Sequence, residues 1–397
     1  MHEGFPAGLR RAPTRRRVLQ QSLAGAGGLA FASALIRRAR ADTAVKIGQI
    51  EALTGPSAAY GIRGRDGALL AVEEINAAGG VADGKGGKVR LELAAEDMAN
   101  DPKQAVTIFR QLATDNAVLA SIGPTNSVGF VPILPIAGQV KLPLIGDGSG
   151  APIKEWNPYA YRVNPISASA VPVMLRKIVA KEKIKRLAVI YDQTQDGQVG
   201  DATVCKNMAG ELGYEVVAFE AFRAGDQDFS PQLATIRSAK PDAVYVAGAT
   251  GDGVRVTSQV KEMGFKQPLL TGYGSFQDPV YWDGTKGQIK SDYTWLGQDL
   301  SSPNAQLKQF LERYNKRFPQ EATSFSTYGY DAVQTIAEAI KRAGGVDREK
   351  VQQALSSIDF ATPLGTKVTF KNPPAGDNLT PSVVVIQVTG RGTYAAV

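Results

Sequence analysis

The chain has 397 residues, 43% hydrophobic and 21% charged, and this length allows two domains that each bury a core. Its formal net charge of +7 would suit a nucleic-acid-binding protein, but residues 1–41 alone carry eight arginines against one glutamate, a surplus of seven. The rest of the chain is therefore neutral overall, which excludes nucleic acid as a partner.

Residues 1–41 have the order of an export signal. Paired arginines in TRRRVLQ (14–20) precede an apolar stretch rich in Gly and Ala, and an Ala-Arg-Ala cleavage pattern follows at 39–41. This order resembles a twin-arginine signal, so we expect a periplasmic protein that begins at Asp42 after cleavage. An amphipathic basic extension is the alternative. Beyond the leader no stretch has about 18 continuous apolar residues, so we expect no membrane span in the mature chain.

Histidine and cysteine are nearly absent from the sequence. The only histidine is His2, within the leader, and the only cysteine is Cys205. Nucleophilic chemistry of the Ser-His-Asp or Cys-His kind is thereby excluded from the mature chain, as is a His-ligated zinc or iron site. Cys205 has helical spacing with Met208 and Leu212, which indicates a small core residue. We expect no metal, no cofactor and no catalysis.

From residue 45 onward, short apolar runs alternate with amphipathic stretches. The expected strands are 45–53, 89–95, 117–122, 142–145, 186–191, 215–221, 243–247 and 269–271. Two helices are expected at 303–317 and 325–343, followed by β-like pieces at 367–370 and 383–388. Strands that alternate with helices build βαβ units, parallel sheets and helices on both faces. The sequence thus predicts an α/β protein with two lobes and a cleft between them.

Three expected strands in the first half run into loops of small and hydroxyl-bearing residues. These loops read LTGPSAAYG (53–61), SIGPTNSVG (121–129) and LIGDGSGAP (144–152). Asn126 or Ser127 can cap the helix after the second loop. Ligands of parallel sheets gather at the carboxyl ends of the strands, where such loops offer backbone N–H groups to an anion. Ordinary turn chemistry explains any single loop better than a site does, and only the grouping of three loops makes a site an equal explanation.

Three motifs that suggest enzymes do not meet the requirements of their chemistry. GGVADGKGG (79–87) contains G-x-x-x-x-G-K, but Gly86 stands where a phosphate loop needs Ser or Thr. GATGDG (248–253) reads G-x-x-G-x-G, which is not the dinucleotide fingerprint. GDGSG (146–150) is not the G-x-S-x-G of hydrolases, and no histidine is present to activate Ser149.

Several longer segments occur in a specific order along the mature chain. They read LTGPSAAYG, AVEEINAAGGV, DPKQAVTIFRQL, IGPTNSVG, PLIGDGSGAP, RVNP, RLAVIYDQTQDGQVG, DFSPQLATIRSAKPDAVYVAG and TYGYDAVQTIAEAI. In order and spacing they resemble the periplasmic solute-binding proteins of branched-chain amino acid ABC transporters. The resemblance covers nearly all of the mature chain. It implies the type I binding-protein fold, in which two Rossmann-like lobes with parallel sheets are joined by a three-strand hinge.

The same resemblance implies a division of the chain. The crossings between the lobes would fall near Asn164, at 296–299 and near Phe360. The first lobe would comprise residues 42–164 with about 298–358, and the second lobe residues 165–297 with about 359–397. In such receptors a small-molecule solute binds between the lobes, and closure signals to membrane permease subunits. These permease subunits are the expected protein partner.

The resemblance also implies contacts to the ligand from the first lobe. The hydroxyl that binds a carboxylate after the third strand corresponds to Thr125, beside Asn126 and Ser127. Tyr60 matches the aromatic residue of the first loop. An ordinary surface tyrosine is the alternative for Tyr60, since aromatic side chains are common in pockets without being diagnostic.

Main-chain contacts after the fourth strand correspond to Gly148 and Ser149. A further hydroxyl that amino-acid binders use there corresponds to Gly150, which has no side chain. In the second lobe, Asp196 stands where the family often has an aromatic residue, and Tyr273 is expected to line the pocket. A helix-cap role is equally open for Asp196.

One departure from the family pattern concerns the solute's amino group. The acidic residue that binds the ammonium group in amino-acid binders falls at Gly274. A buried ammonium without a carboxylate partner is strongly disfavoured. Either Asp196 or Asp147 substitutes, or the solute lacks an amino group, and Asp147 is also a natural turn residue.

We therefore expect the substrate-binding component of an ABC transporter. Its solute would be a branched-chain or related amino acid, or else an amine-free aromatic acid, dicarboxylate or amide. Two other classes are less well supported. An exported dehydrogenase-like enzyme would need a nucleotide loop, which is imperfect here, and a sugar-repressor relative would need a helix-turn-helix in place of the leader.

Overall fold

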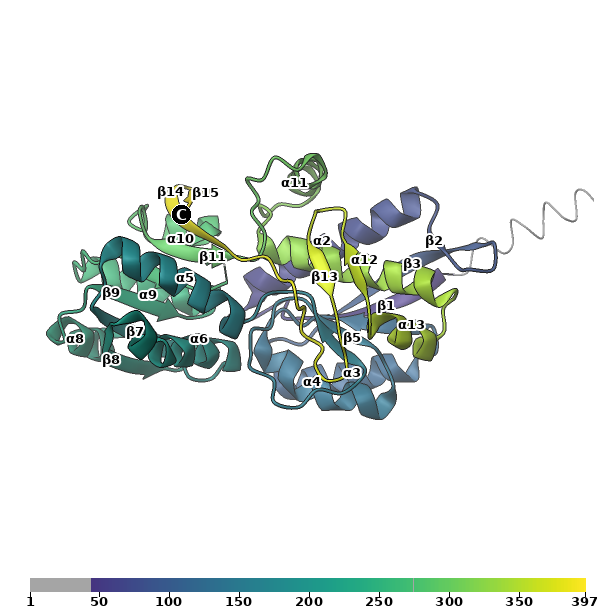
Figure 1. The fold of residues 1–397 in the computed structure, drawn as a ribbon, viewed down its shortest axis with the longest axis horizontal. Coiled ribbons are helices and arrows are strands. Elements are labelled where there is room, and N and C mark those ends of the chain that lie inside the picture. Colours follow the sequence, from purple (N-terminus) through teal and green to yellow (C-terminus); the bar gives the residue numbers. More distant parts are fainter. Residues whose placement is uncertain (1–43, 274) are drawn as a thin grey trace, which may run out of the picture.

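The computed structural model describes residues 44–273 and 275–397. Two α/β lobes lie side by side, each built on its own sheet (Figure 1). The expected α/β class with mostly parallel sheets is confirmed. The predicted export signal, residues 1–41, lies outside the described residues. Within the part of the chain that is described, no helix is long and apolar enough to cross a bilayer.

A six-stranded sheet forms the centre of the first lobe, in the order β2-β3-β1-β4-β5-β6. Its strands are β1 (Ala44–Glu51), β2 (Val81–Ala82), β3 (Lys88–Asp97), β4 (Val118–Ile122), β5 (Leu144–Gly146) and β6 (Ala160–Arg162). All neighbouring strands run parallel except β2 and β3. The ends of β1, β4 and β5 therefore meet at one edge of the sheet, and the three small-residue loops meet there with them.

Within the described residues, six helices belong to this lobe. They are α2 (Ala58–Ala77), α3 (Pro102–Thr114), α4 (Ser127–Val140), α11 (Ala305–Arg317), α12 (Ser324–Ala343) and α13 (Arg348–Leu355). Asn126 caps α4 as predicted, because its side chain accepts a hydrogen bond from Gly129 N. Helices α2 and α12 approach backbone to backbone: a Cβ on Gly67 would lie 1.9 Å from Ser326 O, so only glycine allows this packing.

The second lobe contains a seven-stranded sheet in the order β15-β14-β11-β10-β9-β7-β8. Its strands are β7 (Arg186–Asp192), β8 (Glu215–Phe222), β9 (Ala243–Ala247), β10 (Leu269–Thr271), β11 (Tyr293–Leu296), β14 (Val384–Gly390) and β15 (Thr393–Ala396). Its helices are α5 (Ser167–Glu182), α6 (Asp196–Asn207), α7 (Ala209–Leu212), α8 (Ser230–Ser238), α9 (Thr250–Glu262), α10 (Pro279–Gly284) and the 3-10 helix η2 (Ser275–Gln277). Strand β14 runs antiparallel to both of its neighbours. Cys205 is fully buried in the core of this lobe, as predicted.

The C-terminal stretch differs from the expected division. Residues 359–397 were all assigned to the second lobe, but strands β12 (Asp359–Ala361) and β13 (Lys367–Thr369) pair with each other, and Val368 and Phe370 lie in the core of the first lobe. The ring of Phe370 packs 5.1 Å from that of Tyr161, which explains why this hairpin stays with the first sheet. The yellow segment in Figure 1 crosses to the second lobe only after β13 and enters it at β14, rather than crossing near Phe360.

Helix α12 carries a buried carboxyl group, Asp331, which is 1% exposed. Neither of its oxygens accepts a hydrogen bond of normal geometry from the described residues, although the hydroxyls of Thr362 and Thr366 lie nearby. Burial raises the pKa of Asp331 to about 7 because the charged form is poorly solvated there. In the unfolded chain an aspartate has a pKa of about 3.9.

We predict that Asp331 makes the protein less stable as the pH rises. Between about pH 4 and 7 the folded form holds a proton that the unfolded form has lost, so the free energy of unfolding falls through this window. Replacement Asp331→Asn should reduce that fall by up to about 1.4 kcal/mol per pH unit. Urea unfolding at pH 5, 6, 7 and 8 measures it, with exposed Glu312→Gln as the control. An unchanged slope in the Asp331 variant would contradict the prediction.

Candidate functional site

The three small-residue loops of the first lobe face the second lobe across a closed cleft. A small cavity of about 20 Å³ remains between them, which is room for about one water molecule. The residues that line it come from both lobes and carry no formal charge: Tyr60, Thr125, Asn126, Ser127, Gly148, Gly150, Gln195, Gly197, Gln198, Tyr273 and Phe325. The lobes are therefore closed on each other, and no solute larger than water fits between them in this arrangement.

Most of the predicted site residues meet at this cavity. Seven of them line it, namely Tyr60, Thr125, Asn126, Ser127, Gly148, Gly150 and Tyr273. Ser149 adjoins it, because its hydroxyl lies 3.1 Å from that of Ser127. Asp196 is exposed and lines a separate outer hollow beside Val131 and Pro152, so it gives the cavity no carboxylate. Gly274 lies outside the described residues.

Tyr60 connects the two lobes from the start of α2. Its ring stacks on Phe325 of the first lobe, with ring centroids 4.3 Å apart, and its hydroxyl lies 3.4 Å from Ser275 Oγ of the second lobe. Only 6% of its surface is exposed, which excludes an ordinary surface tyrosine. The small residues before it let the chain turn directly from β1 into α2, so the ring reaches the cleft.

Arg162 orients the backbone of the third loop from behind. Its Nη1 donates to Ser149 O (3.1 Å) and Ala151 O (2.7 Å), and Asn164 Nδ2 also donates to Ser149 O (3.0 Å). The N–H and C=O of one trans peptide point in opposite directions. Because Ser149 O faces the guanidinium, the N–H of Gly150 faces the cavity that Gly150 lines. No acceptor among the described residues takes this N–H, so it is free for an anion.

Donors from both lobes converge on one point of the cavity. A Cβ built on Gly197 would lie 2.9 Å from Ser127 Oγ, 3.2 Å from Tyr273 Oη and 3.8 Å from Gly150 N. A Cβ on Gly150 would lie only 1.6 Å from Tyr273 Oη. The absence of side chains at these two glycines lets the lobes meet, and it concentrates two hydroxyls and a free N–H within a few ångströms.

Thr125 faces away from this point. Its N–H (3.0 Å) and its hydroxyl (2.9 Å) both donate to Glu51 Oε2 at the end of β1. Burial, and then the charge of neighbouring Asp147, raise the pKa of Glu51 well above its usual range, and burial raises the pKa of Asp147 to about 7. The pair is fully buried behind the cavity wall. Both donors of Thr125 are thus engaged by Glu51 in the closed arrangement, and its implied contact to a carboxylate stays a prediction.

Sequence reasoning missed several residues of the site. Glu51 ends an otherwise mostly apolar strand, and a charged residue at such a position could have indicated a buried functional group. Gln195, Gly197 and Gln198 lie in the YDQTQDGQVG loop and at the start of α6, next to the predicted Asp196. A helix turns by about 100° per residue, so a neighbouring position faces another direction. Phe325 gave no local signal, since it reaches the cavity only through the packing of α12 on α2.

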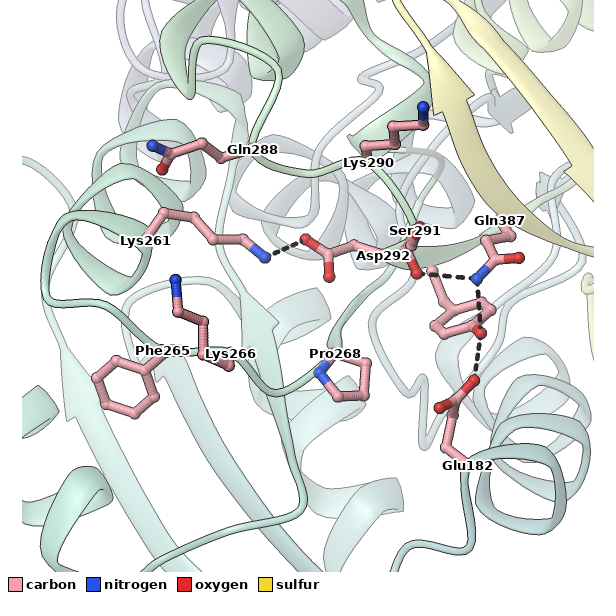
Figure 2. A pocket seen from close by; sticks show the side chains of 11 residues that line it. Glu182, Lys261, Phe265, Lys266, Pro268, Gln288, Lys290, Ser291, Asp292 and Gln387 are labelled. Atoms are coloured by element: carbon pink, nitrogen blue, oxygen red, sulfur yellow. Dashed lines mark hydrogen bonds and ion pairs between the residues drawn. The ribbon is translucent and has the colours of Figure 1, made fainter.

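A larger hollow lies where strands β10 and β11 of the second sheet begin, and charged residues line it. It measures about 470 Å³, and Figure 2 shows Lys261 paired with Asp292 across it. The two side chains are 2.6 Å apart and nearly buried, and burial raises the pKa of Asp292 to about 6. None of the predicted site residues lines this hollow. Among the residues described, no group of three or more His, Cys, Asp or Glu side chains could hold a metal ion.

Comparison with known proteins agrees with this geometry. A family model described as periplasmic binding protein matches residues 44–392. The chain belongs to this family. A leucine-, isoleucine-, valine-, threonine- and alanine-binding protein of Pseudomonas aeruginosa is 30% identical over 330 residues, which cover 82% of this chain and 85% of that protein.

Solved structures of other proteins have the same fold as this periplasmic binding protein. A leucine-binding protein of Thermotoga maritima has a TM-score of 0.77 at 28% identity, covering 89% of this chain and 97% of the other. A solute-binding protein of Rhodopseudomonas palustris, solved with 3,4-dihydroxybenzoic acid, has a TM-score of 0.78 at 23% identity, covering 89% and 97%. The second likeness concerns the fold alone.

We predict that a methyl group at Gly150 keeps the lobes apart. Replacement Gly150→Ala puts a Cβ in the place of Tyr273 Oη, so the variant should scatter as a more open particle and bind solute at least tenfold more weakly, a loss of about 1.4 kcal/mol. Small-angle scattering and calorimetry measure these effects. Adding Tyr273→Ala should restore closure. Gly210→Ala is the control, because nothing lies within 4 Å of its Cβ. A closed Gly150→Ala variant would refute the prediction.

Proposed function

We propose that this periplasmic binding protein captures a small carboxylate-bearing solute for an ABC transporter. The solute is a branched-chain or related amino acid. The observation that carries the proposal is that two donors of the first lobe, Ser127 Oγ and Gly150 N–H, meet Tyr273 and Gly197 of the second lobe at one small cavity. Such donors, in a small site shielded by both lobes, suit a carboxylate oxygen. The amino-acid-binding relative in Pseudomonas aeruginosa supports the solute class.

Capture proceeds by closure of the lobes. A cavity of about 20 Å³ cannot admit a solute from outside, so the lobes must separate before binding and close afterwards. Arg63 of α2 and Asp278 at the start of α10 form an ion pair across the cleft at 2.9 Å, with both side chains 4% exposed. In the open form both charges are solvated by water. In the closed form they are buried, so the ion pair stabilises closure only if its geometry offsets the cost of desolvation.

No chemical step is part of the proposed function. The described lining of the cavity contains no carboxylate, lysine, cysteine or histidine that could act as acid, base or nucleophile. Relatives that match over most of the chain are named as binding proteins. The membrane permease subunits of the transporter would receive the solute, and the periplasm is the compartment in which this receptor would work.

A receptor for an amine-free acid is the second candidate. It is favoured by one observation, namely that no carboxylate lines the cavity to partner an ammonium group. The fold does not decide between the two, since it also occurs in the protein from Rhodopseudomonas palustris solved with 3,4-dihydroxybenzoic acid.

A calorimetric screen of the mature protein tests the function. Amino acids, aromatic acids and short dicarboxylates are titrated separately, and at least one carboxylate should bind. At 100-fold its dissociation constant it should stabilise the fold by about 2.7 kcal/mol. The amide of the best ligand, which lacks the carboxylate charge, serves as the control. If no carboxylate binds, or if the amide binds equally well, the proposal fails.

We also predict that the ion pair across the cleft sets the closure equilibrium. Replacement Asp278→Asn leaves Arg63 without a carboxylate partner in the closed form only, since its other acceptors are the carbonyl groups of Ala59 and Glu321. Solute affinity should therefore fall at least tenfold, which is about 1.4 kcal/mol. Calorimetry and small-angle scattering measure this effect. The matched control is Asp283→Asn, which removes a carboxylate from an exposed ion pair with Arg391. Equal affinities for the two variants would refute the role of the pair.

A further inference from the structure

The side chain of Tyr273 occupies the centre of the site. Its backbone has a φ of 57°, in the left-handed region that a bulky residue rarely adopts. Its hydroxyl lies 2.7 Å from Ser167 Oγ and 3.4 Å from Gly197 O. The same oxygen fills the space beside Gly150, as the 1.6 Å approach to an added Cβ shows. Within the closed cleft, this phenol hydroxyl stands where a solute would otherwise be.

Acceptors surround that hydroxyl on the side of the second lobe. Besides Gly197 O and Ser167 Oγ, the carboxyl group of Asp201 lies close enough to Tyr273 and Ser167 for their hydroxyls to lower its pKa. Burial has the larger effect and raises the pKa of Asp201 to about 7. Asp201 follows Gly197 by four residues on α6, so both positions share the helix face turned toward the cavity.

Asp201 has an incomplete set of partners. Its Oδ2 accepts a hydrogen bond from Tyr245 Oη at 2.6 Å, whereas Oδ1 has no partner among the described residues. The side chain is fully buried. A buried carboxyl oxygen without a donor costs free energy, and it is stabilised when a cationic donor arrives.

We propose that Asp201, Ser167 Oγ and Gly197 O form an ammonium subsite, which a solute enters by displacing the hydroxyl of Tyr273. An ammonium group has three donors and matches these three acceptors, whereas the phenol has a single donor. Asp201 supplies the negative charge that the lining of the closed cavity lacks. This inference rests on the proposed function and selects its amino-acid form.

The carboxylate of the same solute fits on the opposite side. Gly150 N–H and Ser127 Oγ belong to the first lobe, and both lie within 4 Å of the point marked by the Cβ position of Gly197. Tyr273 Oη lies 3.2 Å from that point. The donors for a carboxylate and the hydroxyl that an ammonium would replace thus border the same few ångströms of space, which two groups on one carbon atom can span. An α-amino acid has this arrangement.

Matched ligands test the inference by calorimetry. One series comprises leucine, 2-hydroxy-4-methylpentanoate and 4-methylpentanoate, which differ only in the group on the α-carbon. A second series comprises phenylalanine and 3-phenylpropanoate. The wild-type protein should bind the amino acid of at least one series at least 100-fold more tightly than its deaminated analogue. Replacement Asp201→Asn should reduce this preference to less than tenfold.

Two further variants separate a ligand contact from a structural role. Asp331→Asn removes another buried carboxyl group, one that does not line the cavity, and should keep the full preference. Ser167→Ala should weaken the binding of the amino acid more than the binding of its deaminated analogue. This variant supplies the test if Asp201→Asn does not fold. The subsite would be overturned if the wild-type protein bound an amino acid and its deaminated analogue equally well. It would also be overturned if the variants lost affinity equally for both ligands. Either outcome would leave the receptor function intact. If no carboxylate of either series or of the wider screen binds, the proposed function fails, and the subsite with it.

Discussion

The contact between Tyr273 and Gly150 is the constraint on which the closed structure depends. The two lobes carry polar loops that face each other. The loops can come into contact only where a residue of one lobe has no side chain and a side chain of the other lobe occupies that space. Gly150 supplies the missing side chain and Tyr273 the hydroxyl. The same contact explains why so little free volume remains: the receptor's own phenol takes the place that a solute needs. The hydroxyl of Tyr273 and a bound solute therefore compete for one position.

The first-lobe side of that contact is rigid for an identifiable reason. Arg162 is fully buried, donates to two carbonyl groups of the third loop, and is neutralised by Asp377 at 2.6 Å. A buried guanidinium is unfavourable unless all its donors are used, so the loop carbonyls are held toward it and the opposite N–H is left for the cleft. A positive side chain thus prepares a place for an anion without touching the anion.

Charge is kept one layer behind the cavity on both sides. Glu51 and Asp147 lie behind the wall of the first lobe, and Asp201 lies behind Tyr273 in the second. Burial raises the pKa of all three carboxyl groups, because their charged forms are poorly solvated. The lining consists of neutral groups and the carboxyl groups lie behind it, so no bare charge faces the opposite lobe in the closed cleft.

The sequence by itself determined the α/β class, the three polar loops and most of the residues that line the cavity. The class and the loops follow from local signals, namely alternating apolar runs and small residues at strand ends, with a capping asparagine that the structure confirms. The lining residues follow from the resemblance to the solute-binding family. Only the tertiary structure decided that Asp196 faces outward while Gln195 and Gly197 face the cleft, because a helix start turns neighbouring residues in different directions. It also decided that the β12–β13 hairpin stays with the first lobe, and that Glu51 takes both donors of Thr125. Those outcomes depend on which distant elements pack together, and no local pattern encodes that packing.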